Sequence, residues 1–90
     1  HMTDIETAAP LTALNYAHTV RGAFVRPVTL RTEVLRLGPS WVVSVWCDGA
    51  ALAIERKPAD LAAVLFSAGL RGRRIGNAVR ALLPSALVPA

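Results

Sequence analysis

The feature that most constrains the fold is a pair of strand-like runs joined by a turn dipeptide. The run WVVSVWC is followed by Asp48-Gly49 and then by AALAIERK. Both runs are rich in residues that favour β-strands, and Asp-Gly accepts the positive φ angles of a type I′ turn. The sequence therefore predicts a tight antiparallel hairpin centred on Asp48-Gly49.

A two-residue loop at Asp48-Gly49 would also fix the pairing of the hairpin. One face, mainly core, would pair Cys47 with Ala50, Val45 with Leu52, Val43 with Ile54 and Trp41 with Arg56. The reverse face would pair Trp46 with Ala51, Ser44 with Ala53 and Val42 with Glu55. Trp46 would then lie among small neighbours on a flat surface.

Two more segments precede the hairpin. Alternation from Val28 to about Leu37 predicts a strand that ends at Gly38-Pro39-Ser40. The stretch 11–26 fits a helical stripe or a strand. Its β-branched and aromatic residues, and the cost of Gly22 inside a helix, favour a strand with a bend at Gly22.

Two short helices should follow the hairpin. Pro58 suits a first helical position, and apolar residues recur at helical spacing from Leu61 to Ala68, before Gly69 as a stop. A second apolar stripe begins near Gly72 and ends at Pro84. Its members are Ile75, Val79, Leu82 and Leu83.

These elements predict an α+β fold, with a three- to four-stranded antiparallel sheet and two C-terminal helices packed on one face. We expect residues 1–10 to be a flexible lead-in that starts with a tag remnant, 11–84 to form a single domain, and 85–90 to be a C-terminal tail. A chain of 90 residues that is 53% hydrophobic and 18% charged is too apolar for disorder and can hold one core.

The sheet face opposite the helices is the first candidate site. Trp46, Val42 and Ser44 would lie there, and an aromatic side chain among small residues makes a good interface anchor. The face would bind a protein partner or form a homodimer. The alternative is that Tyr16, Phe24 or Leu35 covers Trp46 within the monomer.

Arginines form the second candidate site. The formal net charge is +4, and no acid follows Asp60, whereas four arginines do. They would contact nucleic-acid phosphates or an acidic protein surface, or simply form a solvated helix face in a chain whose Ala, Leu and Arg content reflects a GC-rich genome. The four are Arg71, Arg73, Arg74 and Arg80.

Catalytic and metal-binding patterns are not found in the sequence. His18 stands alone, Cys47 is expected to be a small apolar filler, and an enzyme would need one of them to meet a carboxylate that the hairpin register does not favour. We therefore expect no enzymatic activity, no metal and no cofactor. A single cysteine favours a reducing cytoplasm, and no run reaches the roughly 18 apolar residues of a membrane span.

The order of elements and one motif resemble a known family. The segment GLRGRRIGNAV (Gly69 to Val79), with identity at Ile75, Asn77 and Ala78, and the run Leu14-Asn15-Tyr16 resemble the small phage anti-CRISPR inhibitors of type I-F surveillance complexes. The resemblance implies a stoichiometric inhibitor, acting in the cytoplasm of a bacterial host, that binds the protein backbone of the complex through its sheet face. Guide RNA would then be kept from target DNA. Of the family's contact residues only a tyrosine has a counterpart, Tyr16, so the others are not transferred.

The leading functional hypothesis is therefore a protein-binding inhibitor that uses Trp46 and its neighbours, with Arg73 and Arg74 at the rim. The alternative is a nucleic-acid-binding module in which Pro58 to Leu83 acts as a helix-turn-helix. Phosphate binding would weaken steeply with salt, whereas the protein contact would survive moderate salt and fail in Trp46→Ala.

Overall fold

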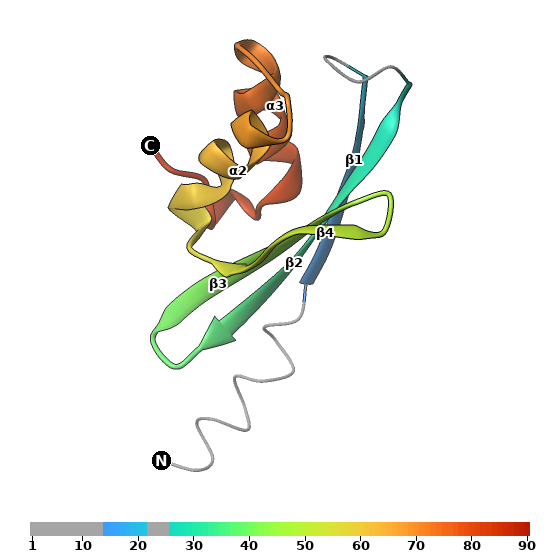
Figure 1. The fold of residues 1–90 in the computed structure, drawn as a ribbon. Helices are drawn as coiled ribbons and strands as arrows, with labels where there is room; N and C mark the ends of the chain where they lie inside the picture. The colour runs from blue at the N-terminus through green and yellow to red at the C-terminus, as the bar shows by residue number, and fades with distance from the viewer. Residues whose placement is uncertain (1–13, 22–25) are drawn as a thin grey trace.

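The computed structural model describes residues 14–21 and 26–90 of the chain. Four strands are followed by two helices, in the α+β arrangement that the sequence predicts (Figure 1). In chain order the elements are β1 (Leu14–Val20), β2 (Val28–Leu37), β3 (Ser40–Cys47), β4 (Ala50–Arg56), a 3-10 turn (Pro58–Asp60), α2 (Leu61–Ser67), α3 (Arg73–Leu82) and a 3-10 turn (Ser85–Leu87).

The strands form one antiparallel sheet in the order β1-β2-β3-β4. The first segment is a strand rather than a helix, and it pairs with β2 from Leu14↔Val34 to Val20↔Val28. The bend predicted at Gly22 lies outside the described residues. Phe24, one of the side chains considered as a cover for Trp46, also lies outside them.

Two-residue turns join the last three strands. At the β3–β4 turn, Asp48 has φ 49° and Gly49 has φ 87°, so both residues adopt the positive φ that a type I′ turn requires. The β2–β3 turn consists of Gly38 and Pro39, with Gly38 at φ 59°, and pairs Leu37 with Ser40. Ser40 therefore opens β3 instead of ending the turn.

The predicted register of the β3–β4 hairpin is correct only next to its turn. Cys47 pairs with Ala50 and Trp46 with Ala51, but Val45 pairs with Ala53 and Val43 with Arg56. The predicted pairs of Val45 with Leu52, Val43 with Ile54, Ser44 with Ala53, Trp41 with Arg56 and Val42 with Glu55 are wrong. Two irregularities in the ladder give β4 extra residues, and each extra residue shifts every later pair.

A contact between Glu55 and Ser44 explains the second irregularity in the β3–β4 ladder. Glu55 adopts φ 51°, and its backbone N–H donates to Ser44 Oγ at 3.0 Å instead of to the strand ladder. A hydroxyl in the neighbouring strand thus satisfies the backbone group that the bulge frees. Strand alternation alone gives no sign of this contact.

The core lies between one sheet face and the two helices (Figure 1). The buried residues of β2 alternate along the strand, and Val43 and Val45 of β3 pair with them. The predicted helix stripes pack on these residues, with Leu61 and Leu65 from α2 and Val79 and Leu82 from α3. Thr32 Oγ1 donates to Leu82 O at 2.5 Å, which ties β2 to the end of α3. The helices therefore cover one face of the sheet.

Gly69 ends α2 as the sequence predicts. It adopts φ 115°, its N–H donates to Phe66 O, and the N–H of Leu70 donates to Leu65 O, each at 3.0 Å. This pair of bonds is a Schellman motif, with buried Leu70 and Leu65 as its apolar contact. The motif sets the direction in which the chain enters α3.

The C-terminal residues pack on the domain rather than only trailing from it. Leu87 and Val88 contact the core cluster, beyond the boundary predicted at residue 84. Within residues 14–21 and 26–90, no helix combines the length and the apolar character needed to cross a membrane.

Candidate functional site: the uncovered face of the sheet

We call the side of the sheet away from α2 and α3 the uncovered face (Figure 1). It is defined by residues whose register places them opposite the buried positions of β2 and β3. These are Asn15 and Ala17 of β1, Arg31, Glu33 and Leu35 of β2, Val42, Ser44 and Trp46 of β3, and Ala51 of β4.

Trp46 stands beside Arg31 at the centre of this face. The two residues are cross-strand partners, and the guanidinium carbon of Arg31 lies 4.4 Å from the centroid of the indole ring. Arg31 Nη1 also donates to Asn15 Oδ1 at 2.8 Å, so the cation is held from both sides. Such a stack contributes about 0.5–1 kcal/mol at an exposed site and keeps the indole in one place.

The side chain paired with Trp46 is therefore a cation, and neither Tyr16 nor Leu35 takes that place. Tyr16 pairs with Thr32 and packs against the core, on the opposite face. Leu35 pairs with Val42, further along β2. Trp46 itself remains only partly buried.

Apolar residues occupy the uncovered face near the β2–β3 turn, beyond the Glu33–Ser44 pair. Leu35 and Val42 oppose each other and are partly buried, and Leu37 is 50% exposed. A cation, a carboxylate and these apolar groups share the face, a mixture typical of surfaces that bind proteins. Glu33 supplies the carboxylate, between Asn15 and Ser44.

The structure separates the four predicted contact residues. Val42 and Trp46 lie on the uncovered face, with side chains that a partner could reach. Ser44 belongs to the same face but is only 5% exposed, and its hydroxyl is used by Glu55. Tyr16 lies on the helix-covered face, so its grouping with Trp46 is wrong.

Arg31 is the residue that sequence reasoning missed. The signal was available, because a two-residue turn at Gly38-Pro39 pairs Leu37 with Ser40 and so places Arg31 opposite Trp46.

The arginine block is divided by its internal contacts. Arg71 Nη1 donates to Phe66 O at 2.7 Å and to Leu70 O at 2.8 Å, at the end of α2, and Arg80 Nη2 donates to Asn77 Oδ1 at 2.6 Å. Arg73 and Arg74 begin α3, where both are exposed. All four arginines are exposed, and two of them, Arg71 and Arg80, are hydrogen-bonded to oxygens of the chain.

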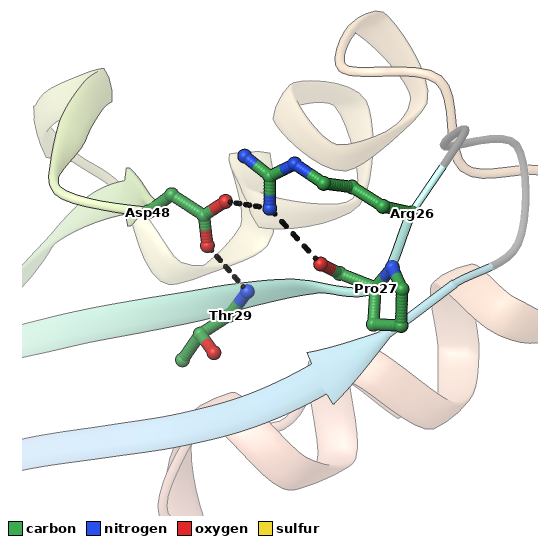
Figure 2. Close-up of polar contacts among 4 residues, drawn as sticks. All are labelled: Arg26, Pro27, Thr29 and Asp48. Carbon is green, nitrogen blue, oxygen red and sulfur yellow. Dashed lines mark hydrogen bonds and ion pairs between the residues drawn. The ribbon is translucent and has the colours of Figure 1, made fainter.

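Asp48 has a structural role at the β3–β4 turn (Figure 2). Its Oδ1 accepts from Thr29 N at 2.8 Å, and its Oδ2 lies 2.7 Å from Arg26 Nη1. Two contacts lower the pKa of Asp48, and the hydrogen bond from Thr29 N has a larger effect than the contact with Arg26. The carboxylate is therefore engaged as an ionised clamp.

The residues considered for catalysis lie apart. His18 and Cys47 both pair with Leu30, from opposite sides, so they are two strand spacings, about 10 Å, from each other. Burial, and then the nearby Asp48 carboxylate, raise the pKa of the Cys47 thiol, which disfavours its nucleophilic form. Among the residues that the structure describes, no cluster of three His, Cys, Asp or Glu side chains could hold a metal ion.

An open groove of about 590 Å³ runs between β4 and α2. Its charged lining consists of Arg56 and Asp60, and most of the rest is small and apolar. The lining residues are Leu52, Ala53, Arg56, Asp60, Ala63, Val64, Ser67 and Ala68. These side chains bring no histidine or thiol together with a carboxylate.

Comparison with known proteins gives no match, whether with protein-family models, with curated proteins or with solved structures.

Proposed function

We propose that this protein is a small non-enzymatic inhibitor that binds a protein partner through the uncovered face of its sheet. The partner is a type I surveillance complex, and binding blocks its recognition of target DNA. The observation that carries the proposal is the position of Trp46, Leu35 and Val42 on the sheet face that neither helix covers.

Two features support this choice. A sheet in a small domain normally buries one face and solvates the other, and polar residues are expected on the solvated side. Here that side carries an indole held by Arg31 and an aliphatic pair. In addition, four strands followed by two helices is the order of elements on which the anti-CRISPR resemblance was based.

Binding to an immobilised type I-F surveillance complex loaded with guide RNA tests the proposal. Wild-type protein should bind and should reduce the shift of target duplex DNA by the complex. Truncation of an interface anchor costs about 2 kcal/mol or more, so Trp46→Ala should weaken binding roughly 30-fold or more.

A matched pair of variants controls for the added charge. Ala51→Glu places a carboxylate beside Trp46, and Ala62→Glu makes the same change on an exposed position of α2. Only Ala51→Glu should lose binding, with circular dichroism used to verify folding of both. If folded Trp46→Ala and Ala51→Glu bind like wild type, the sheet face is not the contact. If wild type does not bind the complex, the partner is a different one.

The helix-turn-helix alternative would use the four arginines as phosphate contacts. One of them, Arg80, is hydrogen-bonded to Asn77 of its own helix, which weakens that alternative. A duplex-DNA mobility shift at about 50 and 200 mM salt distinguishes the two functions, because phosphate contacts are strongly salt-dependent.

A further inference from the structure

We propose that the turn between α2 and α3 is a second binding surface, which takes single-stranded nucleic acid. We call it the turn surface and define it by Phe66, Arg71, Arg73 and Arg74. It goes beyond the proposed function, which uses the other side of the molecule and leaves this charge unexplained.

The first element of the turn surface is an aromatic ring paired with a cation. Phe66 is 52% exposed, and the guanidinium carbon of Arg71 lies 4.0 Å from the centroid of its ring. Two hydrogen bonds, to Phe66 O and Leu70 O, fix the guanidinium there. Nucleic-acid bases stack on both aromatic rings and guanidinium planes, and here the two are held together before any ligand arrives.

The second element is unbalanced positive charge. Arg73 and Arg74 follow Arg71 after one intervening glycine, and both are exposed. No acid occurs in the sequence from Leu61 to Ala90, so no carboxylate of these two helices neutralises the surface. Arginines at the start of α3 also stand at the positive end of the helix dipole, where they do not stabilise the helix. The charge therefore suits an anionic ligand better than it suits the fold.

Two classes of macromolecular ligand carry the several negative charges that could contact these arginines. They are acidic protein segments and nucleic acids. An acidic segment would be attracted by the three arginines but would gain little from a half-exposed phenyl ring. A single strand supplies phosphates for Arg73 and Arg74 and unpaired bases for Phe66 and Arg71. The combination of aromatic and cationic groups favours the single strand.

The turn surface belongs to the helix layer, whereas Trp46 lies on the sheet face that the helices leave uncovered (Figure 1). The two surfaces therefore do not compete for the same ligand. One molecule could hold a protein and a single strand at the same time.

Fluorescence anisotropy with a labelled single-stranded RNA of about 15 nucleotides, at about 50 and 200 mM salt, tests the proposal without any protein partner. Each phosphate contact to a single strand contributes about 0.7 to the salt slope. Arg73→Ala plus Arg74→Ala should therefore lower that slope by about 1.4, which makes the affinity loss between the two salt concentrations about 7-fold smaller than in wild type. Phe66→Leu keeps an apolar side chain but removes the ring, and should weaken binding roughly 5- to 150-fold.

The matched control is Arg56→Ala plus Lys57→Ala, an adjacent and exposed basic pair at the end of β4. It removes the same charge and should leave most of the RNA affinity. Three results would overturn the proposal: equal losses in the two double variants, full affinity in folded Phe66→Leu, or an acidic peptide that binds as tightly as the RNA. Because no surveillance complex is present, these results are independent of whether the sheet face binds one.

Discussion

Thr29 and Asp48 exchange two hydrogen bonds across β2 and the β3–β4 turn. Thr29 N donates to Asp48 Oδ1 at 2.8 Å (Figure 2), and Asp48 N donates to Thr29 O at 2.9 Å. Arg26 contacts the other oxygen of the same carboxylate. These contacts fasten the β3–β4 turn to the start of β2, close to the cross-strand pair of Arg31 and Trp46.

Asp48→Asn should make the stability of the protein less dependent on acid pH. Asparagine tolerates the positive φ and keeps an oxygen for Thr29 N, but it loses the charge that attracts Arg26. The pKa of Asp48 is lowered in the folded state, so its contribution is full above the unfolded value of about 3.9 and is lost as pH falls through the folded value. Wild type should therefore melt at a higher temperature than Asp48→Asn at pH 7, and the gap should close below about pH 4. An equal gap at pH 7 and pH 2 would show that the charge is not responsible.

Glu55→Gly should stabilise the protein. Glu55 adopts φ 51°, a conformation that costs a residue with a side chain about 1–2 kcal/mol, and glycine would avoid this cost. Glycine also makes the unfolded chain more flexible, which offsets about 0.4–1 kcal/mol of the stabilisation. We expect the free energy of unfolding in urea to rise by about 0.5–1 kcal/mol. Glu55→Gln keeps the side chain and should leave stability unchanged. A loss of stability in Glu55→Gly, the ordinary result in a strand, would argue against the bulge.

The elements that local chemistry defines were predictable, and those that depend on contacts between segments were not. The Asp48-Gly49 turn, the glycine stop at Gly69 and the helix stripes follow from single residues and their spacing. The bulge at Glu55 depends on the Ser44 hydroxyl of another strand, which no periodicity records. The sheet face on which Tyr16 lies depends on how β1 pairs with β2. That pairing depends on the length of the loop between the two strands, which the hydrophobic pattern of the sequence does not define.

The same distinction applies to the candidate site. Trp46 and Val42 could be placed on one face because they alternate along a single strand. Arg31 required the register between two strands, and the Phe66–Arg71 pair required the conformation of the turn after α2. Likewise, the hydrogen bonds of Arg71 and Arg80 depend on where the oxygens of Phe66, Leu70 and Asn77 lie.

Thr32→Val should destabilise the fold through the link between sheet and helix. Thr32 is fully buried, and its hydroxyl donates to Leu82 O at the end of α3. Valine has nearly the same shape, so the loss should be that of a buried hydrogen bond, about 1–3 kcal/mol in urea unfolding. Thr29→Val is the matched control, since Thr29 is exposed and bonds to Asp48 through its backbone. Equal effects of the two substitutions would mean that the hydroxyl of Thr32 contributes nothing specific.

Arg31→Ala should weaken partner binding, whereas Tyr16→Phe should not. The first variant removes both the cation on the Trp46 ring and the bond to Asn15, and it leaves the indole free to change rotamer. We expect roughly a 5- to 10-fold loss of affinity for the surveillance complex, which corresponds to about 1–1.4 kcal/mol. Arg31→Lys should recover little, because an ammonium group lacks the flat plane that stacks on the ring. Tyr16 packs toward the core, so removing its hydroxyl keeps the ring in place and the uncovered face intact. A loss of binding in Tyr16→Phe with full binding in Arg31→Ala would place the contact on the helix side of the sheet and contradict the assignment of the face.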